Sequence, residues 1–162
     1  VGSGPFPTEL LDKDGELMRE RGKEYGATTG RPRRCGWFDA VVVRYAVRIN
    51  GLTGIIITKL DVLDAFKEIK ICTGYKYKGK IYDEMPAELN ILEDCEPVYE
   101  NMEGWNKDTL GITEHGMLPE KAKRYLKRLS ELTGVNIDMI STGQKRSETI
   151  IVRNPFKRLV QS

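Results

Sequence analysis

Residues 51–61 read Gly-Leu-Thr-Gly-Ile-Ile-Ile-Thr-Lys-Leu-Asp, and this stretch indicates the fold class of the chain. Gly51 is typical of the end of a helix, and the apolar, β-branched run after it is typical of a strand buried on both faces in a parallel sheet. A polar cluster at residues 59–61 follows the carboxyl end of this strand. Because ligands bind beyond such strand ends in open α/β sheets, the stretch predicts an α/β fold with a candidate site there.

The patterns on either side predict the remaining elements. Asp39 is expected to cap a helix that runs to Asn50 and is apolar nearly all round, which predicts that this helix is buried. Its two arginines, Arg44 and Arg48, then need partners, either acidic residues or a ligand. The other predicted elements are a helix over 15–25 capped by Asp14 and ended by Gly26, a β-hairpin over 67–83, loops over 85–110, a helix over 119–133, strands over 135–140 and 149–152, and a frayed tail over 155–162.

Length and composition bound the class of protein. The chain has 162 residues, of which 40% are hydrophobic and 31% charged, as is typical of a soluble globular domain or part of a larger one. A net charge of +2 is too small for the positive field of a nucleic-acid binder, and no apolar run approaches membrane-spanning length. Three widely spaced cysteines, Cys35, Cys72 and Cys95, indicate reduced cytoplasmic thiols rather than disulfides or a metal site.

The predicted organisation is one α/β unit over residues 1–162, with a mostly parallel sheet, packed helices and a small antiparallel hairpin. Its parts are a lead-in and helix (1–25), an arginine-rich loop (26–34), a helix and strand (35–66), a hairpin and loops (67–110), and a helix with the final strands (119–162). His115, the only histidine, is expected in a surface loop without a catalytic role. Because the chain begins with Val1 rather than methionine, we expect a piece of a longer protein.

Residues 26–34, Gly-Ala-Thr-Thr-Gly-Arg-Pro-Arg-Arg, predict an anion-binding loop, which we call the arginine loop. Gly30 permits a positive φ, and Pro32 pushes Arg31 towards an extended conformation. Guanidinium groups bind carboxylates and phosphates through two parallel hydrogen bonds, so the loop suits ligands of that kind. The alternative is a solvated basic turn. The bulky apolar residues that follow favour a binding loop, because they clamp it to a core.

Two predicted strand ends carry groups suited to guanine. The carboxylate of Asp61 can accept both the ring N–H and the exocyclic amine of guanine, a pair of donors that adenine lacks, while Lys59 lays its stem over the base. Ser-Thr-Gly at residues 141–143 follows a second strand and offers backbone groups for the other wall. An ordinary solvated turn is the alternative at each place.

The sequence contains neither a Gly-x-x-x-x-Gly-Lys-Ser/Thr loop nor another glycine-rich phosphate cradle between a strand and a helix. It also shows no metal cluster and no paired general base. The chain is therefore expected to hold part of an active site, with arginines for anions and a candidate base pocket but without the machinery of phosphoryl transfer.

Several motifs, in this order along the chain, resemble the adenylosuccinate synthetase family. They are Gly-Pro-Phe-Pro-Thr-Glu-Leu at 4–10, the arginine loop with Gly36-Trp37, Thr-Lys-Leu-Asp-Val-Leu-Asp at 58–64, Pro-Val-Tyr-Glu at 97–100, Gly104-Trp105 and Ile-Ser-Thr-Gly at 140–143. The resemblance runs from about Gly2 to Phe156 and covers the C-terminal portion of the family's chain. It implies part of a larger P-loop-like, GTP-dependent ligase fold, whose phosphate loop, catalytic Asp, Mg²⁺ ligand and catalytic His lie earlier and are absent from this sequence.

The resemblance also implies a reaction in the biosynthesis of AMP, in which IMP, L-aspartate and GTP give adenylosuccinate, GDP and phosphate. In the family GTP phosphorylates the 6-oxygen of IMP, and the amine of aspartate then displaces that phosphate, with Mg²⁺ held by residues outside this segment. A cytoplasmic homodimer without nucleic-acid or membrane partners is implied as well. We expect the isolated segment to be inactive, with no catalytic or metal-binding residue of its own.

The same resemblance assigns roles to two sets of residues. The substrate loop for aspartate and IMP consists of Ala27, Thr28, Thr29, Gly30, Arg31, Pro32 and Arg33, with Arg31 on the aspartate carboxylate and the IMP ribose. The GTP set consists of Arg33, Lys59, Leu60, Asp61, Ser141, Thr142 and Gly143. Family members often have Pro-Asp where this chain has Gln144-Lys145, and a charged residue where it has Pro32.

Two other functions remain open at this point. A non-catalytic module that binds guanine nucleotides would use the same base pocket without a reaction. A basic RNA-binding domain fits less well, because the charge is balanced and the aromatic residues are not interleaved with the basic ones.

Overall fold

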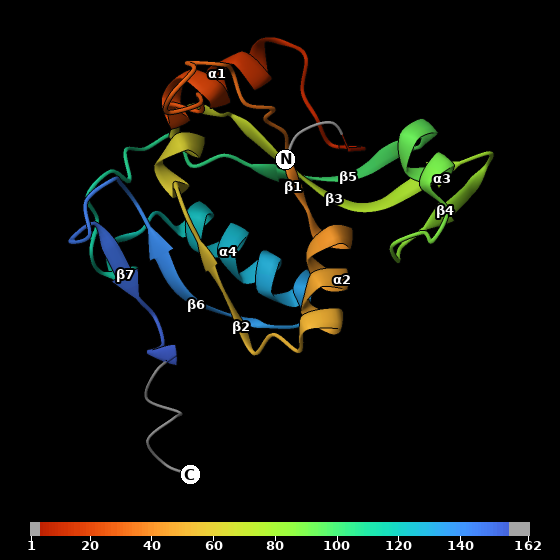
Figure 1. Cartoon of the computed structure of the whole chain (residues 1–162). Coiled ribbons are helices and arrows are strands. Elements are labelled where there is room, and N and C mark those ends of the chain that lie inside the picture. Colours follow the sequence, from red (N-terminus) through yellow and green to blue (C-terminus); the bar gives the residue numbers. More distant parts are fainter. Residues whose placement is uncertain (1–3, 156–162) are drawn as a thin grey trace. The chain divides into compact units, whose positions relative to one another are not determined.

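The structure, a computed structural model, describes residues 4–155 (Figure 1). The tail predicted to fray over 155–162 therefore lies, beyond its first residue, outside the described residues. The chain divides into two compact units, one formed by Val1–Tyr45 with Ile69–Met102 and the other by Ala46–Glu68 with Glu103–Ser162. Each unit is described by itself below.

The first unit is built on the long strand β3. This strand (Glu68–Tyr77) pairs in parallel with β1 (Phe38–Asp39), antiparallel with β4 (Lys80–Tyr82), and also with β5 (Glu96–Glu103). The antiparallel pair forms the hairpin predicted over 67–83, with Lys78 and Gly79 in positive-φ conformations at its turn. The helices are α1 (Lys13–Gly22), α3 (Leu89–Asp94) and the start of α2 (Ala40–Asn50).

A half-buried carboxylate begins α2, as the sequence predicts. Oδ1 of Asp39 accepts hydrogen bonds from the backbone N–H of Val41 at 3.0 Å and of Val42 at 3.2 Å, which caps the helix. Oδ2 accepts the hydroxyl of Tyr75 at 2.6 Å, and Tyr75 is fully buried against Cys72 in the core of this unit. Burial raises the pKa of Asp39, and these hydrogen bonds oppose the rise.

The prediction that α2 is buried nearly all round is wrong. Only Ala40 and Val41 are buried, and the side chains of Val42, Tyr45 and Ile49 are 40%, 37% and 59% exposed. The half-buried guanidinium of Arg44 donates to the backbone carbonyls of Thr73 and Asp83, a type of partner that the sequence did not suggest.

Two local predictions in the first unit are also wrong. Asp12 rather than Asp14 caps α1, because its carboxylate accepts from two backbone N–H groups, and the helix ends at Lys23 in the left-handed region rather than at Gly26. The segment predicted as loops over 85–110 contains α3 and β5. The half-buried pattern of β5, an edge strand that carries Pro97, gave no clear period in the sequence.

The second unit contains the strand predicted after Gly51. Strand β2 (Gly54–Ile57) pairs in parallel with β6 (Asn136–Ser141), which pairs antiparallel with β7 (Thr149–Ile151). Helix α4 (Glu120–Thr133) contacts β6 and buries Ala122, Tyr125, Leu126 and Leu129. Two short 3₁₀ helices, η1 (Leu60–Ala65) and η2 (His115–Met117), complete the unit, and His115 is exposed in η2 as expected.

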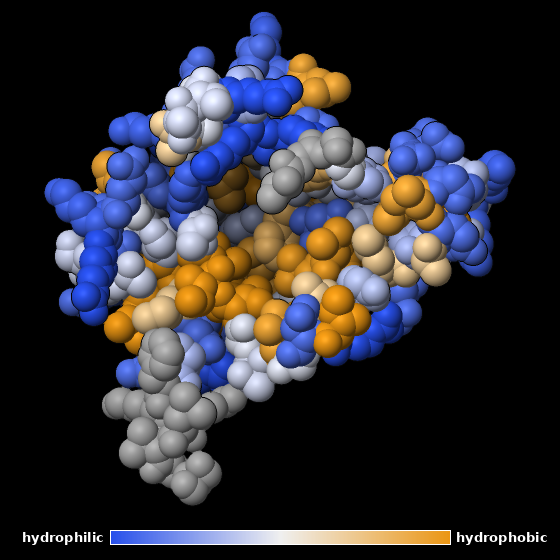
Figure 2. Space-filling model, viewed as in Figure 1, coloured by the Kyte–Doolittle hydropathy of each residue, from blue (hydrophilic) through white to orange (hydrophobic). Residues whose placement is uncertain are grey.

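The two faces of this sheet differ in burial. One row of side chains in register across the three strands consists of Ile57, Ile140 and Ile150. In this row Ile140 is only 1% exposed and Ile150 only 2%. The neighbouring row of Ile56, Met139 and Ile151 points to the opposite face, where Ile56 is 54% and Ile151 59% exposed. Figure 2 shows hydrophobic residues gathered at the surface over β2 and β6. The prediction that β2 is buried on both faces is therefore wrong, because one face of this strand is exposed.

Candidate functional site

The two segments predicted to read a base leave the sheet from neighbouring strand ends. Because β2 and β6 are parallel and Ile57 pairs with Ile140, both strands end at the same edge of the sheet. Residues 59–61 follow β2, and residues 141–143 contain the last residue of β6 and the two after it. The structure thus brings these segments together, and we call them the strand-end site.

The first wall of the strand-end site is a tight turn. Lys59 is exposed and adopts a left-handed conformation, with φ 59° and ψ 42°, at the start of η1. Leu60 is 1% exposed and anchors the turn in the core of this unit. Asp61 is half-buried in the first turn of η1, with its Oδ1 atom shielded from solvent.

The second wall consists largely of backbone groups. The hydroxyl of Thr142, fully buried, donates to the carbonyls of Ile112 at 2.8 Å and Glu148 at 3.2 Å. Ser141 donates from its hydroxyl to the carbonyl of Gly143 at 2.8 Å. A Cβ at Gly143 would collide with the carboxylate of Glu148, so only glycine fits without a rearrangement. Both hydroxyls are thus engaged within the fold, as are the backbone N–H and carbonyl of Thr142, so this segment is held firmly in place.

A buried carboxylate that sequence reasoning did not single out lies in the same 3₁₀ helix as Asp61. Asp64 is 6% exposed, and its Oδ1 accepts from Trp105 Nε1 at 2.6 Å and from Thr109 Oγ1 at 2.8 Å. Its Oδ2 accepts the backbone N–H of Thr109 at 2.7 Å. Burial raises the pKa of Asp64, and the three hydrogen bonds act in the opposite direction. Two signals in the sequence could have indicated this cluster. One is the Asp-x-x-Asp spacing of Asp61 and Asp64 after a strand, and the other is the Gly104-Trp105 pair much later in the chain.

The arginine loop lies in the first unit and is a compact turn. The backbone N–H of Gly26 donates to Arg31 at 2.8 Å, and that of Gly30 donates to Gly26 at 2.9 Å. Gly30 has φ +63°, which confirms the predicted positive φ. Residues 27–34 are all exposed, including the two threonines and the three arginines.

The three arginines of the loop have different surroundings. Arg34 donates to Glu9 Oε2 at 2.6 Å and lies 5.2 Å from the ring centre of Phe6, so it ties the loop to the lead-in segment. The hydrogen bond from this guanidinium lowers the pKa of Glu9. Arg33 pairs with Glu24 at 3.0 Å. Within residues 4–155, the Arg31 side chain makes no hydrogen bond or ion pair.

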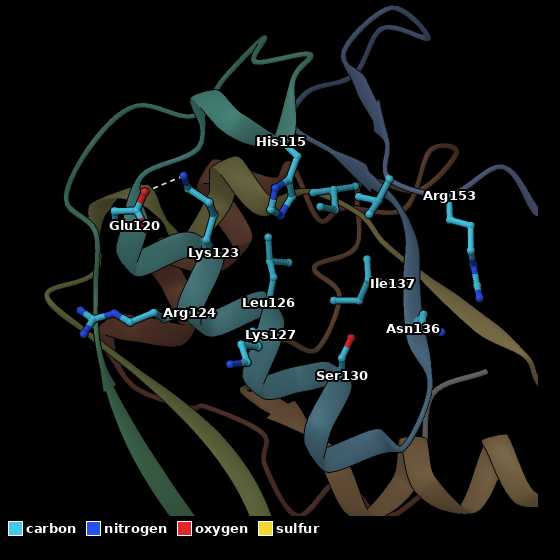
Figure 3. Close-up of a pocket in the computed structure, with 12 residues that line it drawn as sticks. His115, Glu120, Lys123, Arg124, Leu126, Lys127, Ser130, Asn136, Ile137 and Arg153 are labelled. Carbon is cyan, nitrogen blue, oxygen red and sulfur yellow. Dashed lines mark ion pairs between the residues drawn. The ribbon is translucent and has the colours of Figure 1, made fainter.

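A groove of about 720 Å³ lies elsewhere in the second unit, between α4 and the sheet (Figure 3). The groove is lined by the apolar residues Leu126, Ile137 and Ile140. Basic residues of α4 and Arg153, which follows β7, line it as well. Among those basic residues, Lys123 pairs with Glu120 at 2.6 Å, and Arg153 donates to Asp138 at 2.6 Å. Its lining does not include the residues of the strand-end site.

Two kinds of feature are absent from the part of the chain that the structure describes. Among residues 4–155, no group of three or more His, Cys, Asp or Glu side chains is arranged to hold a metal ion. No helix in these residues has the length and apolar character needed to cross a membrane.

Comparison with known proteins identifies the family. The family model described as adenylosuccinate synthetase matches residues 1–150 of the chain. The chain belongs to the adenylosuccinate synthetase family. This membership confirms the resemblance drawn from the sequence motifs, and it agrees with an arrangement of strands and helices of the α/β class.

Individual members of the adenylosuccinate synthetase family are closely similar to this chain. The adenylosuccinate synthetase of Geotalea uraniireducens is 62% identical over 157 residues, and that of Geobacter sulfurreducens is 61% identical; each alignment covers 97% of this chain. The solved structure of fully ligated adenylosuccinate synthetase from Plasmodium falciparum superposes with a TM-score of 0.88 at 41% identity, covering 94% of this chain and 37% of that one. The chain spans about 36% of the length of the two bacterial relatives.

Proposed function

We propose that this chain supplies the guanine-reading pocket and the aspartate- and IMP-binding loop of an adenylosuccinate synthetase. The enzyme would join IMP to L-aspartate at the expense of GTP, forming adenylosuccinate, GDP and phosphate in AMP biosynthesis. The observation that carries the proposal is the placement of residues 59–61 and 141–143 at adjacent parallel strand ends in a member of this family. This is where α/β sheets bind their ligands.

The base is read by Asp61. Its carboxylate accepts the ring N–H and the exocyclic amine of guanine, while the stem of Lys59 lies over the flat face of the base. The backbone of residues 141–143 forms the opposite wall, which the hydrogen bonds of Ser141 and Thr142 hold in place. Adenine offers no matching pair of donors, so binding it would leave the carboxylate unpaired, and this gives strong discrimination.

The arginine loop binds the second substrate. Arg31 has no competing partner among the described residues and is exposed, so it is ready to pair with the carboxylate of aspartate and with the IMP ribose. Arg33 exchanges its surface pair with Glu24 for the ligand on the GTP side and for aspartate. Arg34 holds the base of the loop through Glu9 and does not take part in binding.

The other components of the reaction lie outside this segment. Mg²⁺ is bound by residues of the complete enzyme, which acts as a cytoplasmic homodimer, and the phosphate loop and the catalytic Asp and His belong to its earlier part. The isolated chain therefore forms no adenylosuccinate. Any measurable adenylosuccinate formation by the pure chain with IMP, aspartate, GTP and Mg²⁺ would contradict this part of the proposal.

Calorimetric titration of GDP and ADP into the chain tests base reading. The chain is expected to prefer GDP, and Asp61→Ala is expected to weaken GDP binding roughly 10- to 100-fold, since hydrogen bonds to a charged group are lost. Asp94→Ala, which changes an exposed carboxylate in α3, serves as the matched control and should bind GDP normally. Equal affinity for GDP and ADP, or unchanged binding by Asp61→Ala, would refute base reading by Asp61. If the chain bound GDP tightly but Asp61→Ala left the activity of a complete synthetase unchanged, the alternative of a non-catalytic guanine-nucleotide-binding module would be favoured.

A further inference from the structure

The buried carboxylate of Asp64 links the turn that carries Asp61 to a second segment of the chain. Its three hydrogen bonds all come from one segment, residues 104–112, which we call the brace. A buried carboxylate that accepts three hydrogen bonds is held firmly, because breaking any of them leaves a desolvated polar group. The contact therefore fixes η1 to the brace.

Fixing Asp64 also fixes Asp61. The two residues are three positions apart in the same 3₁₀ helix, and side chains at i and i+3 of such a helix lie on the same side. The orientation of the Asp61 carboxylate thus depends on the rotation of η1, which Asp64 determines through Trp105 and Thr109.

The opposite end of the brace holds the second wall. The backbone N–H of Gly111 donates to the carbonyl of Thr142 at 3.3 Å, and the buried hydroxyl of Thr142 donates to the carbonyl of Ile112 at 2.8 Å. Within the brace, the N–H of Ile112 donates to the carbonyl of Thr109 at 3.2 Å, which closes a turn between the two attachment points. A continuous set of hydrogen bonds therefore runs from one wall of the strand-end site to the other.

The brace is itself anchored in the core of the second unit. Trp105 is 4% exposed and packs on Tyr125 of α4, with ring centres 5.8 Å apart. The backbone N–H of Gly104 donates to Lys67 at 2.8 Å, and the chains approach so closely there that a Cβ at Gly104 would collide with the carbonyl of Phe66. Because the brace is anchored and bonded to both walls, it holds the two walls at a fixed separation.

We propose that Asp64, Trp105 and Thr109 are positioning residues that set the distance between the two walls of the guanine pocket and thereby its selectivity for guanine over adenine. None of them touches the base. This inference rests on the proposed role of Asp61. It adds that the selectivity of that carboxylate is set by a second carboxylate one turn further along the chain.

The test uses Asp64→Asn, which keeps the shape of the side chain but places an amide N–H against a donor. Asp64→Asn is expected to weaken GDP binding roughly tenfold and to reduce the ratio of GDP to ADP affinity, because Asp61 loses its fixed orientation. The control is Thr133→Val, which removes the buried hydrogen bond from Thr133 to Leu129 at 2.8 Å in α4, away from the site. This control should lower stability without changing the affinity ratio.

A second arm needs no ligand. Hydrogen exchange of the Gly111 amide, followed by NMR, reports the bond between the brace and the second wall. Exchange should be faster in Asp64→Asn than in Thr133→Val when both are compared at equal global stability. Trp105→Phe, which removes one donor and keeps an aromatic ring, should give a smaller change in the same direction.

The outcomes separate the two proposals. A folded wild-type chain that shows no preference for GDP would overturn base reading by Asp61, whatever the exchange data show. Normal GDP selectivity in Asp64→Asn, or Gly111 exchange equal to that of Thr133→Val, would overturn the positioning role while leaving base reading intact. A loss of selectivity in Asp64→Asn with faster Gly111 exchange would support the positioning role.

Discussion

The arginine loop and the strand-end site are held in place by different means. Residues 27–34 are exposed, and the loop keeps its shape through turn hydrogen bonds and surface ion pairs. The strand-end site rests on side chains that are almost fully buried, among them Leu60, Asp64 and Thr142. Surface ion pairs contribute little and exchange readily, whereas buried hydrogen-bonded groups resist movement. The difference suits the proposed roles of the two regions, a loop that binds a small charged substrate and a pocket that discriminates between two flat bases.

The largest expected effect is on the brace. Trp105→Ala removes a buried ring and one donor to Asp64, and we expect the free energy of unfolding to fall by roughly 3–5 kcal/mol. Urea unfolding followed by circular dichroism measures this change. Trp105→Phe is the matched control and should lose clearly less. A loss below about 1 kcal/mol for Trp105→Ala would show that the strand-end site is not held by buried contacts.

A second prediction concerns the wall formed by residues 141–143. Gly143→Ala forces the carboxylate of Glu148 aside and should cost about 1–2 kcal/mol, because that carboxylate also accepts the N–H of Lys145 at 2.8 Å. In a Glu148→Ala background the same substitution should cost less, since the colliding atoms are gone. The double-mutant cycle measures this coupling, and additive costs would contradict the steric explanation.

The arginine loop should behave in the opposite way. Arg31→Ala is expected to change the free energy of unfolding by less than about 0.5 kcal/mol, because the side chain is exposed and makes no hydrogen bond or ion pair within residues 4–155. In a complete synthetase that contains this chain, the KM for aspartate should rise roughly tenfold or more. Arg146→Ala, another exposed arginine, should leave that KM unchanged. Steady-state kinetics decides between specific binding and a solvated basic turn.

The smallest expected effect is that of the Glu9 and Arg34 pair at the base of the loop. Arg34 lowers the pKa of Glu9 below its ordinary value of 4.5, so the pair stabilises the fold above that pH and loses its contribution as the pH falls through the lowered pKa. Glu9→Gln should reduce stability by less than about 1 kcal/mol at pH 7, and the difference from wild type should vanish in acid. Urea unfolding at several pH values measures it. A difference that grows towards low pH would contradict the assigned partner.

The sequence predicted the elements whose signals are local. The capping carboxylate of Asp39, the hairpin, α4 and the positive φ of Gly30 all follow from residue type and spacing over a few positions. The apolar run after Gly51 predicted a strand in a parallel sheet, and the structure pairs this strand, β2, in parallel with β6, which brings residues 59–61 and 141–143 together.

What the sequence did not predict depends on contacts between distant residues. The exposure of α2 and of Ile56 cannot be seen in an apolar run, because that pattern describes the side chains and not what covers them. The bonds from Asp64 to Trp105 and Thr109 join residues more than forty positions apart, so no local period reports them. The partners of the arginines were likewise set by the folded surface, which assigned Arg34 to Glu9 and left Arg31 exposed.

The left-handed conformation of Lys59 has a consequence for engineering. A side chain in this region costs about 1 kcal/mol compared with glycine, so the strand-end turn carries strain at the residue that is proposed to cover the base. A screen for thermal tolerance would therefore favour Lys59→Gly and discard the side chain proposed to cover the base. Thermostable variants of this protein should keep position 59 fixed and gain their stability elsewhere.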